Sequence, residues 1–349
     1  MARGESAVEL TVRGAGVFGL SVAYACARRG ARVRLIAAEG LGTGASAGLV
    51  GALAPHVPEA WNPLKQFQLE SLLLAAGWWR EVAASGGVDP LYARSGRVQP
   101  LADEAGVALA RERIAGALAH WQGAAEWSVE PASGGEWEPV SPSGWVLRDS
   151  LAARISPRAA GRSLVAALRA LGAEVIEGEA EERGLVVHAT GWRGMAAFSD
   201  WFGRRLGNGV KGQAAAFRLE AREMPQVYAG GLHVVPHGDG TVAIGSTSET
   251  AWEVDGPDAQ LDALIARARE VMPALAQAEV IERWAGIRPR AASRQLVLGA
   301  WPGRPGHFIA NGGFKIGFGM APKAAEVMAD LLLEGRDLVP ERFRPEGLL

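Results

Sequence analysis

The chain begins with a short apolar run followed by a glycine-rich turn. Residues 8–13 are mostly apolar, and the run ends at the sequence GAGVFG, residues 14–19. From about 18 to 29 the residues follow a helical pattern with one apolar side, and Gly30 is placed to end that helix. A second apolar run, at 33–36, follows at once. This order predicts two parallel strands joined by a crossover helix.

Two kinds of pattern alternate along the rest of the chain. Parallel α/β structure is indicated at 1–50, 157–192 and 306–335, whereas 90–150 and 210–285 contain short strand-like segments between turn residues. The predicted helices cover 63–84, 103–121, 157–172 and 257–272, and a long helix lies near the end of the chain. Predicted strands lie at 173–176, 185–189, 210–219, 226–236 and 241–245.

This alternation predicts two interleaved domains, each built from separate segments. The expected fold class is α/β (α+β overall), with a Rossmann-type dinucleotide-binding domain interleaved with an antiparallel-sheet substrate domain. The expected ranges are 1–85, 150–209 and 286–349 for the first domain, and 86–149 and 210–285 for the second. The length of 349 residues also favours two domains.

Charge and hydropathy narrow the range of partners. The formal net charge is −2, so there is no electrostatic reason to expect nucleic acid or an anionic membrane as a partner. No stretch approaches the ~18 apolar residues of a membrane span. The first apolar segment is typical of a strand and not of a signal peptide, so we expect a cytosolic (cytoplasmic) protein. The sequence does not indicate an oligomeric state.

Cysteine and histidine form no metal or disulfide pattern. Cys26 is the only cysteine and falls in the first predicted helix, where a small buried side chain is expected instead of a reactive thiol. The histidines at 56, 120, 188, 233, 237 and 307 have no ligand spacing, so no metal site is predicted.

The glycine turn carries the first chemical signal. Gly14 permits a tight turn out of the strand, Gly16 lets backbone approach a pyrophosphate, and Gly19 allows the helix and strand to pack closely. The N-terminus of the helix that follows supplies N–H donors and the positive end of the helix dipole. Together with the flanking strands, this turn predicts dinucleotide binding.

The acidic residue that normally binds the adenosine ribose is missing from the end of the second strand. Ala37 occupies its place, and Glu39 follows two residues later in the loop. Glu39 could reach the ribose from there, or it could be a solvated loop charge. No arginine stands at 37–38, so a 2′-phosphate pocket is not indicated.

Further segments resemble the D-amino acid oxidase superfamily of FAD-dependent oxidoreductases, above all its glycine oxidase, sarcosine oxidase and D-amino acid dehydrogenase group. The matching segments are GAGVFG at 14–19, GTGASAG at 42–48, LAP at 53–55, VVHATG at 186–191, VKGQ at 210–213, VP at 235–236, IGST at 244–247, WAGIRP at 284–289 and GGFKIGFG at 312–319. The resemblance covers most of the chain and is vague between 85 and 150.

The resemblance implies FAD as the cofactor. The residues it places near FAD are Gly14, Gly16, Val17, Phe18, Gly19, Glu39, Gly44, Ala45, Ser46, Gly48, Leu49, Thr190, Gly191, Gly312, Gly313, Phe314, Lys315 and Ile316. Covalent relatives use a cysteine near the C-terminal flavin loop or a histidine just after the second strand. Since Cys26 is in the first helix and residues 38–50 contain no histidine, non-covalent FAD is expected.

The implied reaction is oxidation of the C–N bond of a small amino acid or secondary amine of the glycine, sarcosine or D-amino acid type. A hydride passes to the flavin, and O₂, a quinone or another electron carrier then accepts the electrons. The sequence does not decide between an oxidase and a dehydrogenase, and it does not identify the amine.

Arg288 is the candidate partner of the substrate carboxylate, because arginine offers a permanent charge and a two-pronged donor. It is expected to follow an apolar strand, and Arg290 could share its face. Lys315 is a candidate cation near the flavin and the substrate. Tyr228 and His233 are candidates for lining the pocket, as is His56, whereas the tryptophans are assigned to packing.

Some features depart from the family pattern and leave alternatives open. The stretch from 176 to 184 is short, tyrosines are scarce, and His233 stands where a tyrosine is common. An NAD-dependent dehydrogenase would use the same glycine turn but leaves 42–48 and 312–319 unexplained. An FAD-binding protein that has lost catalysis is a third reading, supported by Ala37. A tRNA-modifying amine oxidase is disfavoured by the acidic balance.

Overall fold

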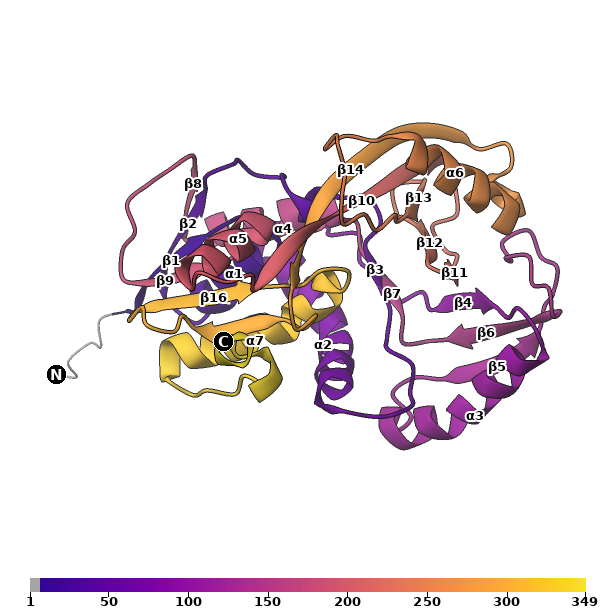
Figure 1. Ribbon diagram of the computed structural model, residues 1–349, viewed down its shortest axis with the longest axis horizontal. Helices are drawn as coiled ribbons and strands as arrows, with labels where there is room; N and C mark the ends of the chain where they lie inside the picture. Colours follow the sequence, from indigo (N-terminus) through magenta and orange to yellow (C-terminus); the bar gives the residue numbers. More distant parts are fainter. Residues whose placement is uncertain (1–6) are drawn as a thin grey trace.

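The computed structural model describes residues 7–349 and contains two large sheets, placed on the left and right of Figure 1. The first has six strands in the order β15-β16-β9-β1-β2-β8. These strands are β1 (Glu9–Arg13), β2 (Arg32–Ala37), β8 (Glu174–Glu177), β9 (Leu185–His188), β15 (Val297–Ala300) and β16 (His307–Asn311). All neighbours pair in parallel except β15 with β16, so the Rossmann-type prediction is confirmed.

Helices cover both faces of this sheet. One face packs against α1 (Val17–Ala27), with α2 (Pro63–Gly86), α4 (Pro157–Ala170) and α7 (Gly317–Glu334) outside it. On the other face lies α5 (Gly191–Trp201), whose Met195 and Phe198 join a smaller core with Ile309. Every residue of α1 is buried, so the prediction of a helix with one apolar side was wrong. The reason is that neighbouring helices enclose it completely.

The connection between β8 and β9 is short, as the sequence indicated, and its contacts with β1 are polar. The short connection there places Glu179 and Glu182 at 2.7 and 3.2 Å from the guanidinium of Arg13 at the end of β1. Thr11, on the same face of β1, donates to the carbonyl of Arg183 at 2.8 Å. This part of the sheet therefore carries charged and hydroxyl groups instead of an apolar cover.

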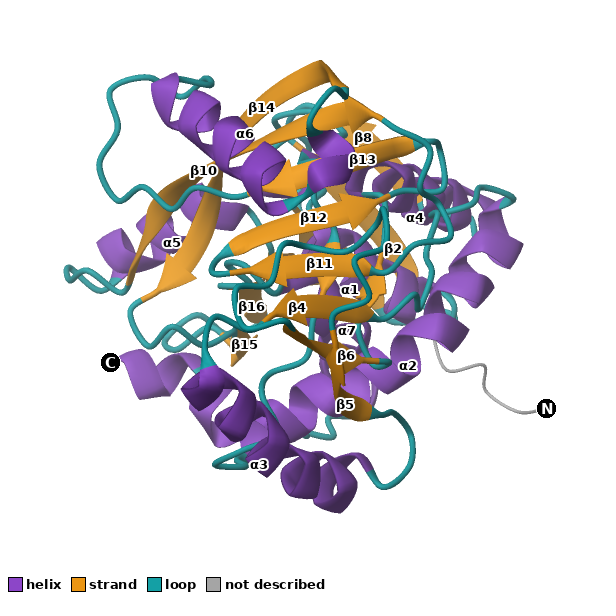
Figure 2. Ribbon diagram, turned by 90° about the vertical axis from the view of Figure 1, so that its right-hand side faces the viewer, coloured by secondary structure: helices purple, strands orange, loops and turns teal. Residues whose placement is uncertain are grey.

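The second sheet has eight strands in the order β14-β10-β13-β12-β11-β4-β6-β5. Its strands are β4 (Arg97–Pro100), β5 (Trp127–Pro131), β6 (Trp145–Asp149), β10 (Gly207–Arg218), β11 (Gln226–Ala229), β12 (Leu232–Pro236), β13 (Thr241–Gly245) and β14 (Glu279–Ala291). The pairing is antiparallel except between β11 and β4. Figure 2 shows α6 (Ala259–Val271) across this sheet and α3 (Glu104–Trp121) near β5.

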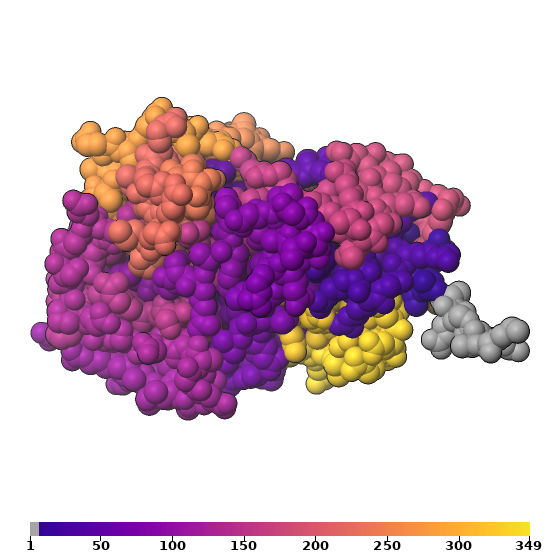
Figure 3. Space-filling model, turned by 180° about the vertical axis from the view of Figure 1, so that it is seen from behind, coloured from indigo at the N-terminus to yellow at the C-terminus, as the bar shows by residue number. Residues whose placement is uncertain are grey.

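Short elements connect the two parts. The strands β3 (Ala52–Leu53) and β7 (Ala153–Arg154) pair with each other between the large sheets. In the view from behind, the early part of the chain, in indigo and purple, covers the middle of the molecule (Figure 3). The interleaving of segments predicted from the sequence is confirmed, whereas the residue limits of the two domains stay a prediction.

Three local predictions were wrong. The segment 226–236 is two strands, because Gly230 and Gly231 take φ angles of +52° and +93° and form a turn. The helix α5 was not predicted. Its first residues, Gly-Trp-Arg-Gly, follow a strand and show no helical periodicity. Arg288 lies within β14 instead of after a strand, and β14 continues beyond residue 285.

Within residues 7–349, no helix is both long enough and apolar enough to cross a bilayer. The same residues contain no cluster of three metal-binding side chains. Cys26 is fully buried, as predicted, and burial raises the pKa of its thiol to about 12.

Candidate active site

The glycine turn after β1 is held by contacts that only glycine permits. Gly14 has a φ of +102°, and a Cβ there would overlap the carbonyl of Ala189 at the end of β9. A Cβ at Gly19 would overlap the carbonyl oxygen of Gly14. Gly19 therefore packs the helix onto the turn and does not line a cavity itself.

The start of α1 faces a cleft and has no acidic residue in its first turn. The Val17 N–H donates to Ser46 Oγ at 2.9 Å, which ties the loop 44–46 to the helix start. A Cβ at Gly16 would lie 3.3 Å from the same Ser46 oxygen, so a side chain here would crowd Ser46. A helix N-terminus with no acidic residue in its first turn, beside a small-residue loop, suits a pyrophosphate.

Most residues predicted to contact a dinucleotide line this cleft. They are Gly14, Gly16, Val17, Phe18, Glu39, Gly44, Ala45, Ser46, Thr190 and Gly191. Trp192 also lines it, which corrects the assignment of the tryptophans to packing alone.

Glu39 has a partner in this structure. Its carboxylate lies 2.6 Å from Arg193 Nε of α5, and both side chains are more than half exposed. This ion pair joins the end of β2 to α5 beside the cleft. The structure therefore places Glu39 at the cleft, and also shows that a cation competes there for its carboxylate.

A cavity of about 230 Å³ continues the cleft toward the second sheet. Val17, Phe18, Ala45 and Ser46 line both spaces. The cavity also includes the predicted residues Gly48, Leu49, Gly313, Phe314 and Lys315. Gly312 does not line it; at a φ of +78° and close to the Gln295 carbonyl, it serves the turn instead. Ile316 lines an adjoining chamber.

Trp284 forms one wall of the cavity, which was not expected. A Cβ at Gly286 would overlap its indole ring, and one at Gly48 would lie 3.2 Å from it. Trp284, Gly286 and Arg288 alternate along β14 and so share one face. The glycine two residues after the tryptophan was the available signal in the sequence, because it leaves space for the ring on that face.

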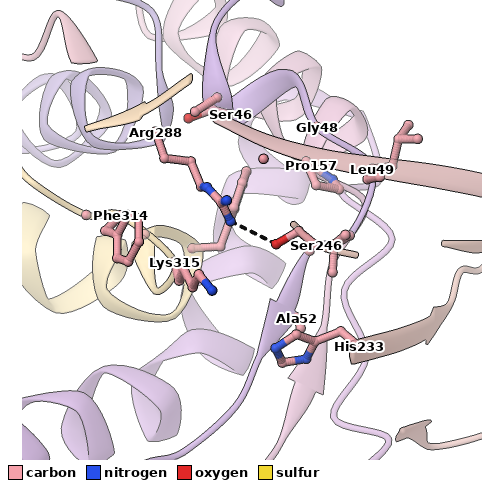
Figure 4. A pocket seen from close by; sticks show the side chains of 18 of the residues that line it. Ser46, Gly48, Leu49, Ala52, Pro157, His233, Ser246, Arg288, Phe314 and Lys315 are labelled. Atoms are coloured by element: carbon pink, nitrogen blue, oxygen red, sulfur yellow. Dashed lines mark hydrogen bonds between the residues drawn. The ribbon is translucent and has the colours of Figure 1, made fainter. Parts of the chain in front are cut away.

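Arg288 projects into the cavity without a carboxylate partner (Figure 4). Its Nη1 donates to Ser246 Oγ at 2.8 Å, and its Nη2 donates to the carbonyls of Lys211 and Thr247. Its Nε is buried with no partner among the described residues. Burial lowers the pKa of this guanidinium to about 10, so it remains charged at neutral pH.

Lys315 lies between Arg288 and His233 in Figure 4. Its side chain is exposed, and partial desolvation together with the charge of Arg288 lowers its pKa. Its Nζ has no hydrogen bond or ion pair with another residue of 7–349, and its one aromatic neighbour is the Phe314 ring at 5.7 Å. Arg290 shares the Arg288 face, with its guanidinium 5.8 Å from the same ring, and donates to Asn208.

Tyr228 and His233 are a cross-strand pair of β11 and β12, with ring centroids 4.8 Å apart. Both line the cavity. Burial, helped by the charges of Arg97 and Lys315, lowers the pKa of His233 to about 4, so its ring is neutral at pH 7. His56 is not part of the wall, because its backbone N–H and its Nδ1 are both held by Gln68.

A buried polar cluster adjoins Arg288 at Lys211, whose carbonyl accepts from Arg288. Lys211 is fully buried and lies 2.6 Å from Asp258 and 3.4 Å from Glu249. Gln213 donates to both of those acids. Because these carboxylates are already paired, the Arg288 charge is left for an anion from outside. A lysine beside a glycine, at 211–212, was the only signal of this cluster in the sequence.

Comparison with known proteins agrees with this geometry. A family model described as FAD dependent oxidoreductase (DAO) matches residues 9–331. The chain is 34% identical to a glycine oxidase of Pseudomonas putida over 143 residues, which are 40% of this chain and only 39% of that protein. It is 24% identical to a glycine oxidase of Bacillus subtilis over 356 residues, covering 93% of both.

Solved structures share the fold. A glycine oxidase from Geobacillus kaustophilus superposes with a TM-score of 0.82 at 23% identity, covering 97% of this chain and 98% of that one. An iminodiacetate oxidase from Chelativorans sp. BNC1 gives a TM-score of 0.83 at 20% identity, covering 96% and 98%.

Proposed function

The chain belongs to the DAO family of FAD-dependent oxidoreductases, and we propose that it oxidises the C–N bond of a small amino acid or secondary amine. The observation that carries this proposal is Arg288, a buried guanidinium without a carboxylate partner that lines a cavity continuing the dinucleotide cleft. Family membership also favours FAD over NAD, the alternative that the glycine turn alone left open.

The residues of the cleft fit FAD. The start of α1 and Ser46 would hold the pyrophosphate, while 44–49 and 313–316 would surround the flavin ring. When bound, FAD supplies the hydride-accepting chemistry. Attachment without a covalent bond is supported by Cys26, which is fully buried in α1. Acid precipitation should then leave the yellow colour in the supernatant.

Arg288 would bind the α-carboxylate of the substrate through its free edge. Ser246 and the two backbone carbonyls fix the guanidinium, so little conformational freedom is lost on binding. A charge-assisted pair of this kind is specific for carboxylates. It would place the carbon next to the amine inside the cavity.

The charges of the cavity favour a neutral amine. Arg288 and Lys315 are both cationic there, and no aspartate or glutamate lines the space. These two positive charges would repel a substrate ammonium group and so favour loss of its proton. His233 in the same wall is neutral at pH 7, so it does not compete for the substrate carboxylate as a further cation. Lys315 would stabilise negative charge as it develops nearby.

The test is anaerobic mixing of the purified yellow protein with glycine, sarcosine, other N-alkyl amino acids and D-amino acids. Loss of the visible flavin absorbance with at least one of them is the expected result. If none of these compounds bleaches the flavin, an FAD-binding protein without amine oxidation becomes the better description. Reoxidation by O₂ compared with a quinone then distinguishes an oxidase from a dehydrogenase.

A further inference from the structure

A second chamber of about 250 Å³ adjoins the cavity on the side away from Arg288. The two spaces share four wall residues, Ala52, Tyr228, His233 and Lys315. Beyond these, the polar side chains of the chamber are Gln68, Arg97 and Gln99. A substrate held at Arg288 can therefore extend past Lys315 into a space that also has a polar end.

Arg97 is built into the wall of this chamber. It lies on β4 with 6% of its surface exposed, and its Nε donates to Asp149 Oδ2 at 2.7 Å across the β4–β6 pair. Asp149 is fully buried on its side chain and also accepts the N–H of Ala152. With the Gln99 amide assigned in the orientation that satisfies its neighbours, its oxygen accepts from Arg97 Nη2 at 3.2 Å. Arg97 Nη1 donates to no group among residues 7–349 and remains available for a ligand.

The charge of the chamber is positive. Arg97 and Lys315 both line it, and no aspartate or glutamate does. Asp149 neutralises one edge of Arg97 from behind, and Lys315 has no counterion in the described residues. A buried ion pair seldom stabilises a protein more than an apolar pair of the same size. Stability alone therefore does not account for the Arg97–Asp149 pair, and we assign it a role in binding. A carboxylate between the Arg97 edge and Lys315 would satisfy both.

The two arginines stand far apart in the sheet. Arg288 is on β14 and Arg97 is on β4, and the four strands β10, β13, β12 and β11 separate them. At about 4.8 Å per strand this separation is roughly 24 Å between strand axes, and both long side chains then reach inward. An amino acid as short as glycine would fill the Arg288 end and leave the chamber vacant.

We propose that the substrate is an amino acid with a second carboxylate, several bonds from the first on its side chain or N-substituent, which binds between Arg97 and Lys315. This inference rests on the proposed oxidation at the Arg288 end and names the class of amino acid that is oxidised. Arg97 is then a residue that determines specificity.

The experiment compares matched acid and amide substrates on the FAD-loaded enzyme. Suitable pairs are D-glutamate with D-glutamine, and N-(2-carboxyethyl)glycine with its terminal amide. In the wild type, kcat/KM should favour the acid by at least ~10-fold, the effect of one charge-assisted contact. In the double variant Arg97→Met/Asp149→Asn, which removes the cation together with its buried partner, this ratio should fall to about one.

A control variant and a binding measurement complete the test. Arg148→Met removes an arginine of β6 that pairs with Glu130 and Glu138 and lines neither space, so the acid-to-amide ratio should stay high. Calorimetry with glutarate and its monoamide on the same proteins reports the chamber without turnover. Equal affinity of the wild type for glutarate and the monoamide would overturn the inference. Oxidation of neutral amino acids with no preference for acids would also overturn it while leaving the proposed function intact.

Discussion

The guanidinium of Arg288 lies where a side chain of Gly212 would be. Gly212 is on β10, beside β14, and a Cβ there would overlap Nη2 and Cζ of Arg288. Because Gly212 has no side chain, the Arg288 guanidinium can occupy this space.

We predict that Gly212→Ala displaces Arg288 and raises the KM for amino-acid substrates by at least ~10-fold, the cost of one charge-assisted contact. Steady-state kinetics measure the effect. Gly161→Ala is the matched control, since a Cβ at Gly161 meets nothing within 4 Å. An unchanged KM in Gly212→Ala would mean that Arg288 does not bind substrate in the observed position.

Arg288→Ala should raise the KM for an amino acid by at least ~10-fold and affect a carboxylate-free amine of similar size much less. The reason is that the contact exists only for substrates with a carboxylate. FAD content should stay near that of the wild type, because Arg288 lines the cavity and not the dinucleotide cleft. Equal losses for both substrates would assign Arg288 to the fold or to the flavin.

Lys315→Met should slow flavin reduction more than it weakens FAD binding. Negative charge near the lysine grows only as hydride is transferred, so the lysine acts mainly on the transition state. Loss of one such group typically costs on the order of 10²–10³ in rate. Anaerobic stopped-flow absorbance measures the rate, and the control is Lys323→Met, which removes a lysine of α7 that pairs with Glu70 of α2.

The ion pair between Glu39 and Arg193 allows a test of whether Glu39 binds the adenosine ribose. If Glu39 binds the ribose, Glu39→Ala should weaken FAD by about 10-fold, the value of a hydrogen bond to a charged group. Arg193→Ala should then weaken FAD less or strengthen it, since it frees the Glu39 carboxylate. Titration of the apoprotein with FAD measures both affinities. Equal weakening in the two variants would instead indicate that the ion pair itself closes the cleft.

His233 should make stability depend on pH. Burial lowers its pKa to about 4, below the ordinary value of 6.5, so between these two values the unfolded chain binds more protons than the folded one. Stability is therefore greatest above about pH 6.5 and falls as the pH drops toward 4, by up to roughly 3 kcal/mol from this residue. Denaturant unfolding from pH 7 to 4.5 measures the slope, and His233→Asn should reduce it. His188 has its pKa lowered in the same direction and should keep part of the slope.

The sequence determined those features of the fold that depend on residues close to one another in the chain. The turn at Gly14, Gly16 and Gly19 needs residues without a Cβ, and the segments on either side have the periodicities of strand and helix, so the dinucleotide cleft could be predicted. The alternation of parallel and antiparallel patterns predicted the interleaved fold. The segments WAGIRP at 284–289 and GGFKIGFG at 312–319, which resemble the family pattern, contain the two cations of the cavity, Arg288 and Lys315.

Only the tertiary structure decided which distant residues meet. Arg97 reaches the chamber of Lys315 because β4 pairs with β11 and β6, and Glu39 meets Arg193 because α5 follows β9 on the same side of the sheet as the end of β2. The Lys211 cluster likewise joins β10 to Asp258 across 47 positions of the chain. Periodicity and turn chemistry depend on residues that are close in the sequence. These contacts depend instead on the order and register of the strands, which short segments of a single sequence do not specify.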